Sequence, residues 1–386
     1  MSAVDLSLSD DQQQFRDLAR TWVDREVVPY AAEWDRTEAV DRAIVGKLGE
    51  VGFLGMGIAE EYGGSGGDTL SYCLMMEELG RGDTSVRGIV SVSLGLVGKS
   101  IAAYGTEEQK QRWLPGLASG ESLGCFGLTE PGTGSDAGSL AARATRDGDG
   151  DWRITGNKLF ITNGTWADWS LVFARTGGPG PKGITAFVVP TDSQGFAALE
   201  IKGKLGLRGQ ATAELTLDNV RVSDEHRLGE EGQGFRIAMS ALDKGRMSVA
   251  AGCVGLARAC LEASVEYAGQ RTQFGKPIAS YQLVQEMLAE MAVETDAARL
   301  LVWRVADLVD RGERFGTEAS MAKMFASEAA VKAANQAIQV FGGYGYVDEF
   351  PVGKYLRDAR VTTLYEGTTQ IQKLLIGRAL TGISAF

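Results

Sequence analysis

The chain has 386 residues, 23% of them charged and 44% hydrophobic, which is the composition of a soluble globular protein of two or three domains. A net charge of −11 argues against broad nucleic-acid binding and against docking on an anionic membrane. No apolar run approaches about 20 residues, and the N-terminus lacks a signal-peptide pattern. We therefore expect a cytoplasmic protein without a transmembrane helix.

Cysteine and histidine usage narrows the possible chemistry. The four cysteines, Cys73, Cys125, Cys253 and Cys260, form no Cys-x-x-Cys pair and lie in apolar contexts, where free cysteine behaves as a small hydrophobe. The only histidine is His226, in a polar stretch. This scarcity argues against serine–histidine hydrolysis and histidine-based zinc sites. If the chain is an enzyme, its chemistry rests on a carboxylate or a bound cofactor.

The first ~120 residues predict helices. Ser9 with Gln12 forms a capping box, and the helix that it opens should end before Pro29. Thr106 with Gln109 forms a second capping box. Between them, further helical runs are expected at about residues 41–49, 69–79 and 84–104.

Residues 122–232 have a different pattern, rich in β-branched and aromatic side chains between turn residues. This predicts an antiparallel β domain, with strands at residues 152–155, 170–174, 184–189 and 214–217. The acidic run 147–151 resembles a calcium loop, but Lys158 stands at the twelfth position, where that loop needs a bidentate acid. We therefore predict a hairpin turn there, and no metal site.

From about Gly234 onward the chain predicts Ala-rich helices of about 30 residues with a period near 3.6, which is typical of a packed bundle. The expected fold class is α+β. The expected domains are a helical one at residues 1–121, a β domain at 122–232 and a helical bundle at 233–386.

Four segments could line a site for a polar ligand, because they join glycines to hydroxyl, amide, aromatic or basic groups. They are Phe126 to Asp136, Phe160 to Gly164, Arg271 to Lys276 and Gln339 to Gly345. The first is neither a P-loop nor part of a βαβ unit. Taken singly, each segment is also compatible with an ordinary loop or a helix cap.

A fifth segment carries a candidate general base. Glu366 lies between Tyr365 and Gly367, and the glycine allows a flat ligand to approach the backbone closely. Thr368 and Gln370 add neutral hydrogen-bonding groups downstream. Access, low polarity and a fixed partner suit a proton-abstracting carboxylate. The alternative is a solvated glutamate in a helix turn.

Together these segments resemble one family, the acyl-CoA dehydrogenases, over essentially the whole chain. The strings LTEPGTGSD, FITNG, RTQFGK, QVFGGYGY and LYEGTTQIQ occur in the family's order and approximate spacing. The resemblance implies a helical N-terminal domain, a middle β domain and a C-terminal four-helix bundle. It also implies bound FAD, and a homodimer or homotetramer.

The resemblance assigns the cofactor residues by motif. Phe160 and Thr162 should stand against the flavin ring, and many relatives carry Trp where Phe160 stands. Gln339, Gly342 and Gly343 should reach the adenine end from a neighbouring subunit. The remaining implied FAD contacts are Phe126, Leu128, Thr129, Gly134 and Ser135 beside the flavin, Arg271, Gln273, Phe274 and Gln282 toward the adenine and pyrophosphate, and Thr368 and Gln370.

The resemblance also implies a reaction. Glu366 would remove a proton from the carbon beside a thioester carbonyl, its pKa being raised by burial, while hydride leaves the next carbon for flavin N5. The Glu366 N–H and a ribityl hydroxyl would stabilise the carbonyl oxygen. The product would be a trans-2-enoyl thioester, with electrons passing to an electron-transferring flavoprotein. One branch of the family places its base at the position of Gly245, which cannot act as one.

The resemblance places substrate contacts at Ser135, Asp243, Arg246, Tyr365 and Gly367. The acyl group is left open. A short saturated or branched acyl-CoA from fatty acid or amino acid catabolism is favoured. Arg87, however, stands where glutaryl-CoA dehydrogenases carry an arginine for a distal carboxylate. Because Arg87 falls near an expected exposed helix start, a solvated or salt-bridged role is the alternative.

The sequence leaves three further functions open. The acyl group could be bound to a carrier protein. An oxidase of the same fold would pass electrons to oxygen. A nonenzymatic acyl-CoA-binding protein would also share the fold, although the retained Glu366 and flavin set argue against it.

Overall fold

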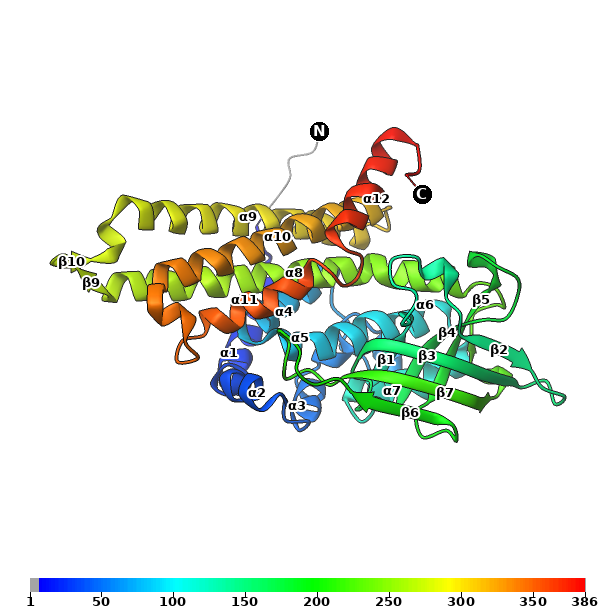
Figure 1. The fold of residues 1–386 in the computed structure, drawn as a ribbon. Helices are drawn as coiled ribbons and strands as arrows, with labels where there is room; N and C mark the ends of the chain where they lie inside the picture. The colour runs from blue at the N-terminus through cyan, green and yellow to red at the C-terminus, as the bar shows by residue number, and fades with distance from the viewer. Residues whose placement is uncertain (1–6, 386) are drawn as a thin grey trace.

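The computed structural model describes residues 7–385 and shows helices at both ends of the chain with a sheet between them (Figure 1). Both predicted capping boxes are confirmed: Ser9 caps α1 and Thr106 caps α7. The N-terminal helices are α1 (Asp10–Glu26), α2 (Ala31–Thr37), α3 (Ile44–Glu50), α4 (Thr69–Gly82), α5 (Thr84–Val90), α6 (Lys99–Tyr104) and α7 (Glu107–Ser119).

The run predicted at residues 84–104 is helical throughout, but its middle is wound more widely than an α-helix. The segment Ser91–Gly98 between α5 and α6 is a π-helix, and every one of its side chains is buried. Stretches of π-helix are rare and are frequently found at functional sites, and this one lies against the long helix that follows the sheet.

The middle of the chain forms an eight-stranded sheet in the order β6-β7-β3-β2-β4-β5-β8, with β1 paired to β4. Most pairs are antiparallel as predicted, but β1 runs parallel to β4, and β2 meets β4 in one parallel pair. The predicted hairpin turn is confirmed, because Arg146 pairs with Trp152 across it. The strands are β1 (Gly124–Gly127), β2 (Arg143–Arg146), β3 (Trp152–Thr162), β4 (Trp169–Arg175), β5 (Ile184–Pro190), β6 (Phe196–Glu200), β7 (Thr212–Val222) and β8 (Arg227–Leu228).

The C-terminal helices run side by side, and the sheet lies near one end of the longest of them (Figure 1). That helix, α8, has 37 residues and spans about 55 Å. A short hairpin of β9 (Thr272–Gln273) and β10 (Lys276–Pro277) lies at its far end. The other helices are α9 (Gln282–Asp310), α10 (Gly316–Phe341), α11 (Val352–Thr362) and α12 (Thr369–Thr381).

The central helices are apolar because they are core helices. Thr84–Tyr104 and Gly234–Gln270 are long and apolar enough to cross a membrane, but 83% and 72% of their most apolar windows are buried inside the molecule. One hydrophobic cluster joins the N-terminal helices, one face of the sheet and the bundle. All four cysteines are buried and free, as predicted.

Candidate active site

Glu366 lies on a tight turn between α11 and α12. Its φ is +53°, and Gly367 follows with φ +91°. A left-handed glutamate costs about 1–2 kcal/mol, so the surrounding contacts must hold it. The Thr368 hydroxyl accepts from the Ile371 N–H at 3.3 Å and caps α12, which therefore begins only after the turn.

Side chains from three helices donate to the two carbonyl groups of this turn. The Gln372 amide donates to the carbonyls of Glu366 and Gly367 at 3.1 and 3.0 Å. Lys323 Nζ on α10 donates to the Gly367 carbonyl at 2.8 Å. Arg246 Nε on α8 donates to the Glu366 carbonyl at 3.4 Å, and its Nη1 pairs with Asp243 at 2.6 Å.

The Glu366 carboxylate has the properties expected of a base. Its Oε2 is buried, with no hydrogen-bond partner among residues 7–385. Burial raises the pKa of Glu366 to about 7, although Arg87, Lys323 and Arg246 act to lower it. A Cβ at Gly245 would lie 1.9 Å from Oε2, so the carboxylate occupies the space that a side chain at position 245 would fill.

Arg87 is buried, and the solvated or salt-bridged role considered from its sequence position is wrong. Its side chain is on α5, and the residue is 2% exposed. Its Nη2 donates to the Tyr365 hydroxyl at 2.7 Å, while Nη1 is buried without a partner. Within the described chain it forms no ion pair. Gly252 on α8 leaves room for this side chain, because a Cβ there would lie 2.2 Å from Arg87 Cδ.

The loop after β1 is held by an ion pair that sequence reasoning missed. Lys158 Nζ on β3 bonds to Glu130 at 2.8 Å and to the carbonyls of Leu128 and Phe173 at 3.2 and 2.7 Å. Glu130 also accepts the N–H groups of residues 141 and 142 at 2.6 and 3.0 Å. The sequence signal for this ion pair was Lys158 itself, which stands at a position of β3 where the alternation of the strand points inward.

The same loop fits a large polar ligand. No atom of residues 7–385 lies within 4 Å of a Cβ built at Gly132 or Gly134, and Ser135 is exposed. The Thr133 hydroxyl oxygen is buried without a partner in the described chain. Phe126 and Leu128 are nearly buried, and Thr129 is partly buried. Open glycines beside an unsatisfied hydroxyl are consistent with a site for the flavin part of FAD.

The end of β3 presents an aromatic face to solvent. Phe160 has φ +60° and is 65% exposed, so it could cover one side of a flat ring. The Thr162 hydroxyl donates to Gln210 Oε1 at 3.2 Å. The Gln210 amide in turn lies against Gly88 on α5, where a Cβ would be 1.8 Å from Nε2. This chain of contacts joins the predicted flavin face to the helix of Arg87.

The residues assigned to the adenine end lie elsewhere. Arg271 and Gln273 line a cavity of about 750 Å³ together with Gly342 and Gly343. The Arg271 guanidinium stands 5.4 Å from the centre of the Tyr344 ring. Phe274 is 94% exposed, and Gln282 and Gln339 are also exposed.

One chain does not bring the two sets of cofactor residues together. The flavin-side loop lies near the start of α8, where a Cβ at Gly138 would be 3.8 Å from Phe235. Arg271 follows the last residue of α8, about 55 Å away along the helix. Only Gln339, Gly342 and Gly343 were expected from a neighbouring subunit, but the structure groups Arg271 and Gln273 with them.

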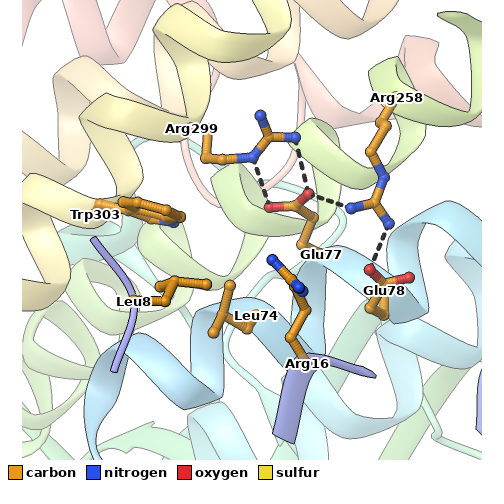
Figure 2. Close-up of a pocket in the computed structure, with 8 residues that line it drawn as sticks. All are labelled: Leu8, Arg16, Leu74, Glu77, Glu78, Arg258, Arg299 and Trp303. Atoms are coloured by element: carbon orange, nitrogen blue, oxygen red, sulfur yellow. Dashed lines mark hydrogen bonds and ion pairs between the residues drawn. The ribbon is translucent and has the colours of Figure 1, made fainter. Parts of the chain in front are cut away.

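A smaller cavity of about 300 Å³ lies beside α4, away from the predicted sites (Figure 2). Glu77 pairs with Arg258 and Arg299 at 2.8 and 3.0 Å, and Glu78 pairs with Arg258 at 2.6 Å. Because guanidinium groups of other helices engage both carboxylates, this cluster joins α4 to α8 and α9.

Comparisons with known proteins agree with this architecture. Family models match in three consecutive segments: "Acyl-CoA dehydrogenase, N-terminal domain" at residues 9–121, "middle domain" at 125–220 and "C-terminal domain" at 232–381. An acyl-CoA dehydrogenase of Bacillus subtilis is 45% identical, over 98% of this chain and 100% of that protein.

Two solved structures are similar over nearly their whole length. Butyryl-CoA dehydrogenase from Megasphaera elsdenii superposes with a TM-score of 0.95 at 41% identity, covering 98% of this chain and 100% of that one. A glutaryl-CoA dehydrogenase from Mycobacterium smegmatis in complex with FADH2 gives a TM-score of 0.94 at 38% identity, covering 98% and 96%.

Proposed function

This chain belongs to the acyl-CoA dehydrogenase family and is an FAD-dependent oxidoreductase acting on acyl-CoA, and from this premise we propose its reaction in detail. The proposed reaction removes hydrogen from the α- and β-carbons of a short or branched acyl-CoA to form the trans-2-enoyl-CoA. Glu366 is the general base in this proposal. The acceptor of the β-hydrogen, as hydride, is FAD, which supplies the redox chemistry that protein side chains lack.

The observation that carries this proposal is the state of the Glu366 carboxylate. Its Oε2, buried beside Gly245 and without a partner among residues 7–385, is available to take a proton from a substrate C–H bond. A pKa of about 7 keeps a useful fraction ionised at neutral pH while leaving the carboxylate basic enough to take a proton.

The backbone of the same turn can stabilise the charge that develops on the thioester carbonyl oxygen. Proton removal next to a thioester places negative charge on the carbonyl oxygen, which needs a hydrogen-bond donor. Among the described residues, the Glu366 N–H donates no backbone hydrogen bond. The base and one donor for the carbonyl oxygen are therefore offered by the same residue.

A second copy of the chain would complete the FAD site. The loop after β1, Phe160 and Thr162 would hold the flavin end, and Arg271, Gln273, Gly342 and Gly343 of another copy would hold the adenine end. The support is the distance of about 55 Å between these sets within one chain. We therefore propose that the protein is a homodimer or homotetramer. We also propose that it is soluble and cytoplasmic, and that it passes electrons to an electron-transferring flavoprotein.

One observation favours a second candidate substrate, a dicarboxylyl-CoA. Around Glu366, the guanidinium of Arg87 and the ammonium of Lys323 are buried, and within residues 7–385 neither forms an ion pair, while Arg246 pairs with Asp243. A buried cation without an anion is costly. A distal carboxylate on the acyl group would satisfy the free Nη1 of Arg87.

The first experiment is the anaerobic visible spectrum of the purified protein before and after addition of butyryl-CoA and, separately, glutaryl-CoA. Bleaching of the flavin band by butyryl-CoA is the expected result. Bleaching by glutaryl-CoA alone would establish the second candidate. A flavin that responds to neither, or a colourless protein, would contradict the proposal. Oxygen uptake without an added acceptor would identify an oxidase. Bleaching of the flavin only by an acyl group bound to a carrier protein would identify that acyl-carrier protein as the substrate.

A further inference from the structure

Lys323 has an environment that helix packing alone does not explain. It lies in the middle of α10, is fully buried, and forms no ion pair among residues 7–385. Its ammonium donates a hydrogen bond to the carbonyl oxygen of Gly367, at 2.8 Å. An apolar residue would fill this space without the cost of burying a charge.

The turn that Lys323 contacts needs support from outside. Two consecutive left-handed residues place the carbonyls of Glu366 and Gly367 outside the hydrogen bonds of α12. Gln372 contacts both carbonyls from α12 itself. Lys323 contacts the turn from a separate helix, α10, and can therefore fix the position of the turn relative to the bundle.

The titratable groups around Lys323 belong to the same site. Arg246 and Cys253 face it from α8, Glu328 from its own helix, and Glu366 from the turn. Glu328 is engaged by the Thr369 hydroxyl at 2.7 Å, and Arg246 by Asp243. Glu366 is therefore the carboxylate nearby whose Oε2 is still without a partner.

We propose that Lys323 is a positioning residue for the base: its ammonium holds the Gly367 carbonyl and fixes the left-handed turn of Glu366 against α10. This inference rests on the proposed role of Glu366. The direction of the electrostatic effect is clear, because Lys323 lowers the pKa of Glu366 against the opposing effect of burial. Without the cation, more of the carboxylate would be protonated at neutral pH.

The test compares kcat between pH 5.5 and 9 for three variants of the flavin-containing protein. Lys323→Met should reduce kcat at pH 7 about tenfold and move the acid limb of the profile up by about one pH unit, as expected for the loss of a nearby opposite charge. Lys323→Gln keeps a donor for the Gly367 carbonyl and should recover part of the rate, with the acid limb still shifted. Gln372→Leu removes a neutral donor, and should lower kcat without shifting the limb.

Lys332→Met is the matched control, because Lys332 lies on the same helix but is exposed and paired with Glu290 and Glu294 on α9. It should leave kcat and its pH profile unchanged. Flavin content and thermal unfolding are measured for every variant, so that losses of kcat due to misfolding are recognised. If Lys323→Met misfolds, the pH profile of Lys323→Gln tests the inference. A Lys323 variant that holds flavin and has the acid limb of the wild type would overturn the inference. A wild-type flavin that no acyl-CoA bleaches would instead overturn the proposed function.

Discussion

Two of the regions in which the molecule buries charge differ in how the charges are matched. Beside α4, Glu77 and Glu78 are each bonded to guanidinium groups of neighbouring helices (Figure 2). Around the turn before α12, Glu366 Oε2 and Arg87 Nη1 are both buried without partners in the described chain. The first region pairs both of its carboxylates with guanidinium groups, whereas the second leaves a carboxylate oxygen without a partner.

This difference separates structure from function. A matched buried cluster fixes how helices meet, and its cost is offset within the protein. Unmatched groups reduce stability, and they are retained where a ligand or a reaction uses them. The comparison predicts that substitutions in the Glu77 cluster affect folding, whereas those near Glu366 affect turnover.

The largest effect is expected from Glu366→Gln. The amide keeps the size of the side chain but cannot take the proton, so kcat should fall more than about 10³-fold, or about 4 kcal/mol. The flavin should remain bound, since no other contact of the turn is removed. Stopped-flow flavin reduction by butyryl-CoA measures the rate, and near-wild-type turnover would refute the assignment of the base.

Arg87→Ala should come next, and its effect should depend on substrate. If the free Nη1 receives a distal carboxylate, the loss of a buried ion pair should reduce dicarboxylyl-CoA turnover by about 10²-fold or more. Butyryl-CoA turnover should change little. Steady-state assays with both substrates test this, with Arg36→Ala, an exposed cation on α2, as control. Equal losses on both substrates would remove Arg87 from the acyl site.

Glu77→Gln should act on folding instead of catalysis. Glu77 bonds to two arginines and its side chain is 7% exposed, so the free energy of unfolding should fall by about 3 kcal/mol. The kcat per bound flavin should be unchanged. Thermal unfolding measures the first quantity, with the exposed Glu286→Gln on α9 as control. A catalytic defect in correctly folded Glu77→Gln would contradict the separation of the two regions.

The smallest effect is on the pH dependence of stability. The pKa of Glu366 rises from an ordinary 4.5 to about 7 in the folded chain, so the folded state binds this proton more tightly than the unfolded state. Its contribution to stability is therefore present below about pH 4.5 and is lost as pH rises toward 7. Melting temperatures of Glu366→Gln and wild type should diverge between pH 5 and 7.5 in favour of the variant. Parallel curves would mean that the carboxyl is not perturbed.

Much of the fold was predictable because local patterns encode it. The capping boxes of Ser9 and Thr106, the hairpin at residues 147–151 and the long helices after Gly234 were all read from neighbouring residues. The π-helix Ser91–Gly98 and the parallel pairing of β1 with β4 were not, because each depends on contacts with distant segments. Glu366 was found from its immediate neighbours and from the family's motifs.

The sequence by itself determined the order of helical and β regions, the family resemblance and the identity of the candidate base. Only the tertiary structure decided that Arg87 is buried, that Glu366 Oε2 faces Gly245, and that Lys323 and Lys158 hold the loops of the site. The physical reason is that propensity and periodicity act between neighbours in the chain, whereas the burial of a charge is set by the helices that close around it.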